Sequence, residues 1–114
     1  MSFFVYFYQS AEVPGKPGTP VVSDIGATTA TVTWTPPQSD GGSRITGYIV
    51  EMKETMSTRW VKSTKESFEL THLTVENLTE GREYEFRVSA CNMAGTGQPS
   101  DLSKTFKAKP PYGK

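Results

Sequence analysis

One stretch in the C-terminal half of the chain constrains the fold more than any other feature. In LTEGREYEFRV (78–88), Tyr84, Phe86 and Val88 alternate with charged residues. Side chains of an extended strand point to opposite faces in turn, so a period of two places the apolar residues together on one face. The stretch therefore predicts a half-buried β-strand, with Glu85 on the face that contacts water.

The residues just before this strand indicate what kind of sheet it joins. Gly81 suits a tight turn that a residue with a Cβ would strain, and Leu78 is expected to be buried beside it. Tyr84 can bury its ring and return its hydroxyl to the backbone of the turn. Such a tyrosine corner is typical of immunoglobulin-type β-sandwiches.

The rest of the chain supplies the other strands. A Pro/Gly-rich lead-in precedes them, no helical period of useful length is present, and the further strands are expected within 13–22, 27–35, 45–53, 59–64, 73–78 and 101–109. About seven short strands at regular spacing predict an all-β fold, an immunoglobulin-like seven-stranded antiparallel β-sandwich. Its predicted core residues are Trp34, Tyr48, Val50, Leu78, Tyr84, Phe86 and Val88.

Composition narrows the classes of partner. The chain has 114 residues, which is one domain by size, and its 12 basic and 12 acidic residues cancel. This balance gives no reason to expect nucleic acid or a membrane as a partner. Cys91 is the single cysteine, so no internal disulfide can form. We expect Cys91 to be a small buried or half-buried side chain.

No residues suggest catalysis. His72 is the only histidine, and with one cysteine it cannot complete a zinc site of sensible spacing. Gly41 and Gly42 precede a strand rather than a helix, which excludes a phosphate-binding loop. Paired acid and base carboxylates need a cleft that nothing here predicts. We therefore expect no enzyme activity, no catalytic residue, no cofactor and no metal.

Basic residues offer candidate contacts for a protein partner. Arg82 and Arg87 on the strand described above, with Lys104 and Lys107 near the last strand, could line one sheet as a basic stripe. The alternative is an ordinary solvated face in which glutamates alternate with these charges.

The two ends of the chain are set apart from the domain. Phe3 to Tyr8 is a run of six apolar residues without basic neighbours, shorter than a signal-peptide core or a membrane span. We interpret residues 1–12 as a remnant foreign to the domain or as a segment that packs on a partner. The domain is expected to span 13–110, and 111–114 to begin a linker.

Several stretches together resemble a known family. PGKPGTPVV, TWTPPQSDGGSRITGYIVEMK, LTEGREYEFRVSACNMAGTGQPS and AKPPY are similar to a fibronectin type III domain over about residues 14–112. The detailed sequence of these stretches resembles the modules of titin, twitchin and myosin-binding protein C. The resemblance implies that Trp34 and Tyr48 pack in the core and that Tyr84 forms the corner.

It also implies a function. The chain would be a non-catalytic structural and interaction module of a sarcomeric, cytoplasmic muscle protein. It would be monomeric by itself, would space neighbouring immunoglobulin or fibronectin domains, and would have myosin as a candidate partner. The alternative is an extracellular module of a cell-surface receptor or adhesion protein, for which sugar on the sequon residue Asn77 would be a distinguishing feature.

Overall fold

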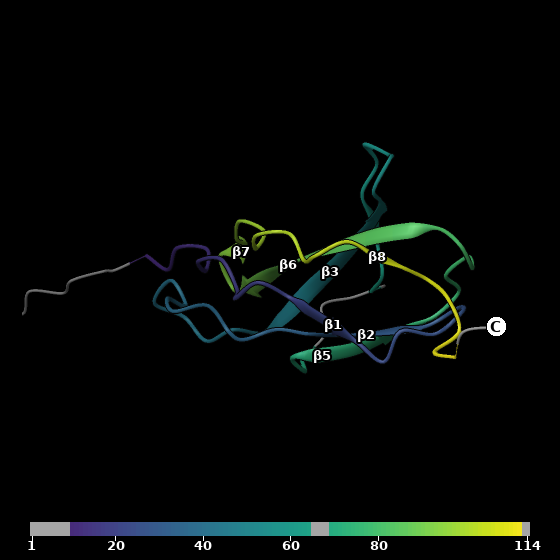
Figure 1. The fold of residues 1–114 in the computed structure, drawn as a ribbon. Helices are drawn as coiled ribbons and strands as arrows, with labels where there is room; N and C mark the ends of the chain where they lie inside the picture. The colour runs from purple at the N-terminus through teal and green to yellow at the C-terminus, as the bar shows by residue number, and fades with distance from the viewer. Residues whose placement is uncertain (1–9, 65–68, 113–114) are drawn as a thin grey trace, which may run out of the picture.

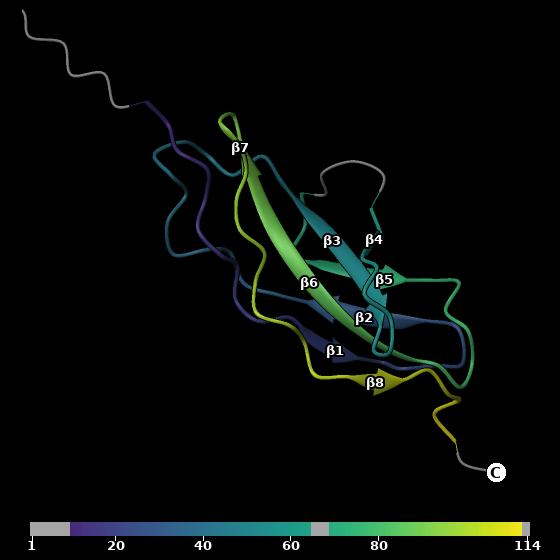
Figure 2. The ribbon, with the colours of Figure 1, turned by 90° about the horizontal axis from the view of Figure 1, so that it is seen from above.

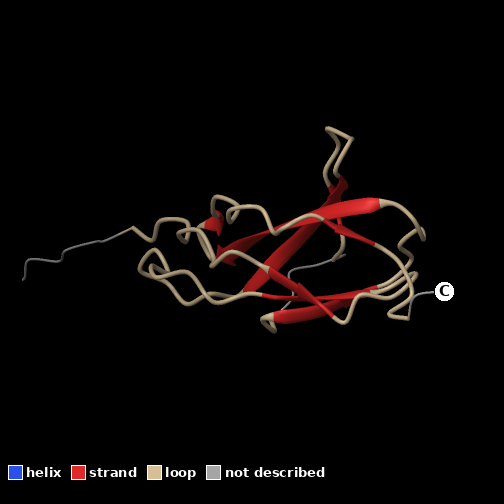
Figure 3. Ribbon diagram, in the orientation of Figure 1, coloured by secondary structure: helices blue, strands red, loops and turns tan. Residues whose placement is uncertain are grey.

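Two layers of antiparallel strands face each other across one apolar core (Figure 1). The computed structural model describes residues 10–64 and 69–112. Every regular element in this part of the chain is a strand, as Figure 3 shows, so no helix within it is long or apolar enough to cross a membrane. The predicted all-β antiparallel sandwich is confirmed.

The first sheet has three strands in the order β1-β2-β5. They are β1 (Val21–Ser23), β2 (Ala30–Thr33) and β5 (His72–Val75). Ala30 and Val32 of β2 are buried, whereas Thr31 and Thr33, which alternate with them, are half-buried and exposed. The alternation of small or β-branched residues with threonine explains why this segment forms a strand with one wet face.

The second sheet is built around one long antiparallel pair, β3 (Gly47–Glu54) and β6 (Glu83–Asn92). This pair runs in register from Gly47 opposite Cys91 to Glu54 opposite Tyr84. Short strands complete the sheet (Figure 2): β4 (Val61–Lys62) beside β3, and β7 (Gly95–Thr96) and β8 (Phe106–Lys107) beside β6.

The strands differ in detail from the predicted ones. The described part of the chain contains eight strands, because the chain folds back after β6 as the short strand β7. The strand predicted over 73–78 ends at Val75, and Asn77, with a left-handed φ of 63°, lies beyond its end. The strand predicted over 101–109 is reduced to β8. Upstream of β8, the hydroxyls of Ser100 and Ser103 accept hydrogen bonds from amides of β6.

The core lies between the sheets. The rings of Trp34 and Tyr48 meet edge to face at 5.5 Å, and Phe86 stacks on Phe106 at 5.7 Å. At most 4% of the surface is exposed in each of the residues Trp34, Tyr48, Val50, Leu78, Tyr84, Phe86 and Val88, and Ala30, Val32, Ala90 and Ala108 are buried with them.

The turn before β6 has the form of a tyrosine corner. The backbone N–H of Thr79 donates to the hydroxyl of Tyr84 at 2.8 Å, and Leu78 is buried beside it. Gly81 adopts a φ of 91°, and its N–H donates to the carbonyl of Ala108 at 2.7 Å. The corner therefore ties the start of β6 to the end of the last strand.

Candidate functional site

The outward face of the second sheet carries two cross-strand ion pairs. Glu51 on β3 lies opposite Arg87 on β6 and accepts a hydrogen bond from its Nε at 2.9 Å. Lys53 lies opposite Glu85, and the two form an ion pair. Charges of opposite sign directly across two strands stabilise the pairing, and here they also cancel each other.

An aromatic ring from the neighbouring segment lies over this face. The guanidinium of Arg87 is 4.2 Å from the centroid of the Trp60 ring, and Nζ of Lys53 is 5.6 Å from it. Such cation–π contacts are favourable, the more so where water is partly excluded. Trp60 is half-buried, so the ring and the paired charges form one packed layer.

Glu85 lies in this layer, and the prediction that it contacts water is wrong. Only 8% of Glu85 is exposed. The physical reason is the ion pair with Lys53, whose ammonium also lies against Trp60. A buried carboxylate is tolerated when a cation pairs with it.

Two of the four candidate basic residues are paired with carboxylates. Arg87 binds Glu51, as described above, and Arg82 donates to Oε1 of Glu54 at 2.6 Å. This hydrogen bond, together with the charge of Glu54, raises the pKa of the Arg82 guanidinium above its ordinary value. Both arginines therefore have a local counter-charge.

The other two candidates lie at the C-terminal end of the domain, Lys107 on β8 and Lys104 in the segment before it. Lys104 and Lys107 are exposed, and neither forms an ion pair with any residue that the structure describes. Lys104 borders a groove of about 530 Å³ between β1 and the segment before β8, where the apolar side chains of Val21 and Leu102 are exposed. Of the four basic residues in the predicted stripe, the two lysines are thus the ones whose charge is not paired with a carboxylate among the described residues.

The histidine and the cysteine considered in the sequence analysis lie apart from this charged layer. His72 is exposed on β5, at the edge of the first sheet. Cys91 is 9% exposed, with the Thr96 hydroxyl 3.4 Å from its sulfur. Within residues 10–64 and 69–112, no three side chains of His, Cys, Asp or Glu form a group that could hold a metal ion.

Comparison with known proteins identifies the family. The model of the family described as fibronectin type III domain matches residues 15–106. The chain belongs to the fibronectin type III family. Fast-type myosin-binding protein C of Homo sapiens is 40% identical over 100 residues, which are 88% of this chain and 9% of that protein.

Solved structures agree with this assignment. A segment of titin with domains A168 to A170 superposes with a TM-score of 0.82 at 41% identity, covering 87% of this chain and 33% of that one. The twitchin kinase region of C. elegans gives 0.81 at 31% identity, covering 90% and 18%. This fibronectin type III domain spans less than a tenth of the length of the curated relatives it matches.

One structurally important residue of this fibronectin type III domain was not recognised from the sequence. The side chain of Asn92, at the end of β6, is 6% exposed and makes three hydrogen bonds to backbone groups. The available signal was the stretch NMAG (92–95), since an Asn before a turn that ends in Gly commonly bonds its own backbone.

Proposed function

We propose that this domain is a non-catalytic structural and interaction module of a larger intracellular muscle protein, where it spaces the domains before and after it. Its relationship to myosin-binding protein C and to titin carries the proposal. The chain spans less than a tenth of its curated relatives, as expected of one module among many.

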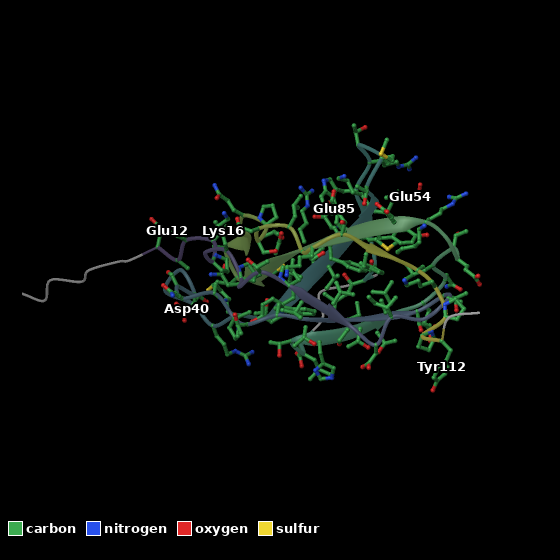
Figure 4. All side chains as sticks on the ribbon, viewed as in Figure 1. Glu12, Lys16, Asp40, Glu54, Glu85 and Tyr112 are labelled. Carbon is green, nitrogen blue, oxygen red and sulfur yellow. The ribbon has the colours of Figure 1, made fainter. Side chains whose placement is uncertain are left out.

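The path of the chain supports a spacing role. Figure 4 shows Glu12 at one end of the sandwich and Tyr112 at the other, so the chain enters and leaves at opposite ends. β1 is hydrogen-bonded in the first sheet and β8 in the second. A pull along the long axis would therefore act on the hydrogen bonds of both terminal strands before the domain could lengthen.

The location can be tested directly. Antibodies raised against the chain should label striated muscle in bands that repeat with the sarcomere. Labelling confined to the cell surface, or sugar on Asn77 in the native protein, would contradict an intracellular muscle module and favour an adhesion protein.

We further infer that two exposed lysines, Lys104 before β8 and Lys107 on it, contact the myosin thick filament. The protein name of the 40% identical relative, myosin-binding protein C, motivates this choice of partner. Lys104 and Lys107 are exposed and unpaired among the described residues, so they are available to acidic groups on a partner.

Co-sedimentation of the chain with purified myosin filaments tests this contact. We expect binding that weakens as salt rises, because exposed charges are screened within about 10 Å at 0.1 M salt. The double substitution Lys104→Ala/Lys107→Ala should reduce binding severalfold. The matched control is Arg59→Ala/Lys62→Ala, which removes two exposed positive charges from the opposite, β4 edge of the same sheet.

If both double variants lost the same amount of myosin binding, the binding would depend on the net charge of the domain rather than on a contact made by Lys104 and Lys107. Absence of binding at high micromolar concentration would contradict the myosin contact and leave a spacing module without a thick-filament ligand.

A further inference from the structure

The segment before β1 follows a period of three. Pro14, Pro17 and Pro20 are buried, whereas the residue before each of them, Val13, Lys16 and Thr19, is exposed. Three residues per turn is the period of the polyproline II helix, which makes no internal hydrogen bonds and leaves its backbone free for other partners. A Pro/Gly stretch that reads as a linker therefore lies against the domain with one face buried.

Its backbone amides follow the same period. Every third N–H donates to a carbonyl in the segment after β2, at 2.8–3.0 Å: Glu12 to Gly41, Gly15 to Ser39 and Gly18 to Thr35. We call residues 12–18 the N-terminal arm. The arm extends the antiparallel pairing of β1 with β2 to the end of the molecule.

Two glycines allow the arm to lie this close. A Cβ on Gly41 would come within 2.0 Å of the carbonyl oxygen of Glu12. A Cβ on Gly97 would come within 2.1 Å of the carbonyl oxygen of Pro14. Both distances are far shorter than any van der Waals contact. The arm can therefore pack in this position only because residues 41 and 97 have no side chain.

Asn92 fixes the outer end of the arm. Its Nδ2 donates to the carbonyls of Glu12 and Asp40, both at 2.7 Å, and its Oδ1 accepts from the N–H of Ala94 at 2.8 Å. One buried side chain thus joins the arm, the loop after β2 and the turn after β6. Figure 4 shows Glu12, Lys16 and Asp40 together at this end of the sandwich.

We propose that Asn92 is a positioning residue that makes residues 12–18 a rigid part of the domain, so that whatever precedes them leaves at a fixed place and in a fixed direction. This deepens the proposed spacing function and rests on it. With the arm released, the pivot would move from residue 12 to about residue 20. About eight polyproline II residues, at 3.1 Å each, would then let the preceding segment sweep a radius of roughly 25 Å.

Amide hydrogen exchange tests whether Asn92 holds the arm. Asn92→Asp keeps an acceptor for Ala94 but places a carboxylate oxygen against two carbonyl oxygens. We expect the amides of Glu12 and Gly15 to exchange about tenfold faster or more, while those of the β3–β6 pair keep their rates. Gly97→Ala, which leaves Asn92 intact and displaces the arm at Pro14, should give the same result.

The control is Lys16→Ala. It removes the exposed ion pair of the arm with Asp101, with 52% and 73% of the two side chains exposed, and should change the exchange rates little. Unchanged exchange at Glu12 and Gly15 in Asn92→Asp would overturn the role of Asn92, whatever the result for Gly97→Ala.

Spin-label distances test the consequence for direction. Nitroxides at Ser10→Cys and Thr33→Cys, in a Cys91→Ala background, should give a narrow distance distribution that broadens with Asn92→Asp. An equally broad distribution in both proteins would show that the arm does not set a direction. Neither measurement involves myosin or muscle, so this inference and the proposed function can fail separately.

Discussion

Trp34 joins the two sheets at the scale of single residues. It follows β2, and its ring meets that of Tyr48 on β3 edge to face at 5.5 Å, with 3% of Trp34 exposed. Replacing it removes a large buried ring and leaves a cavity that neighbouring side chains fill only in part. We expect Trp34→Ala to lower the free energy of unfolding by about 3–5 kcal/mol, measured by urea titration.

The second tryptophan provides the control. Trp60 is half-buried and lies over charged side chains rather than in the core. Trp60→Ala should cost only about 0.5–2 kcal/mol, the range of a cation–π contact. If the two substitutions cost the same, the assignment of Trp34 to the centre of the core would be wrong.

The burial of a side chain could be predicted from the sequence where neighbours in its own strand decide it. It could not be predicted where contacts with a distant segment decide it. The apolar face of β6 follows from alternation alone, because neighbours within one strand decide which way Phe86 points. Glu85 obeys the same alternation and yet is buried. Its burial depends on Lys53 and Trp60, which only the folding of β3 and β4 brings to that face.

At the scale of elements, the segment that leads into β8 is held to β6 by side chains as well as by its backbone. The Ser103 hydroxyl accepts from the N–H of Phe86 at 2.9 Å and donates to the carbonyl of Lys104 at 3.0 Å. Ser103 is 5% exposed, so removing its hydroxyl leaves a buried amide without a partner. We expect Ser103→Ala to lower the free energy of unfolding by about 1–3 kcal/mol in a urea titration.

Ser57→Ala is the matched control, since the Ser57 hydroxyl accepts from Arg59 in an exposed turn where water can replace it. A similar small effect from both substitutions would mean that the amide of Phe86 finds another partner when Ser103 is lost.

The order and type of the elements could be predicted, but the ends of several strands could not. Periodicity identifies a strand wherever apolar and polar residues alternate. It does not show that hydroxyls replace backbone groups before β8, nor that the chain folds back at β7. The N-terminal arm did carry a signal, the period of three in PGKPGTP, but its meaning depends on a groove that other segments form.

At the scale of the whole molecule, the arm should contribute to stability. Removing residues 1–18 takes away three backbone hydrogen bonds and the buried side chains of Pro14 and Pro17. We expect this truncation to lower the free energy of unfolding by about 2–4 kcal/mol, since each hydrogen bond contributes about 0.5–1.5 kcal/mol. Removing residues 1–9 alone should leave the urea midpoint nearly unchanged.

Two other results are conceivable and informative. Equal midpoints for the two truncated chains would show that the arm adds no stability. A large loss on removing residues 1–9 would show that the apolar run Phe3 to Tyr8 belongs to the folded unit.

A chain that enters a sandwich at one end and leaves at the other makes each module a unit of length. A protein that repeats such units can measure distance by counting them, as a ruler does. If each unit also fixes the direction of the one before it, the array has a defined twist. The same face then returns at regular intervals along it, where it can meet sites that recur with the same period on a filament.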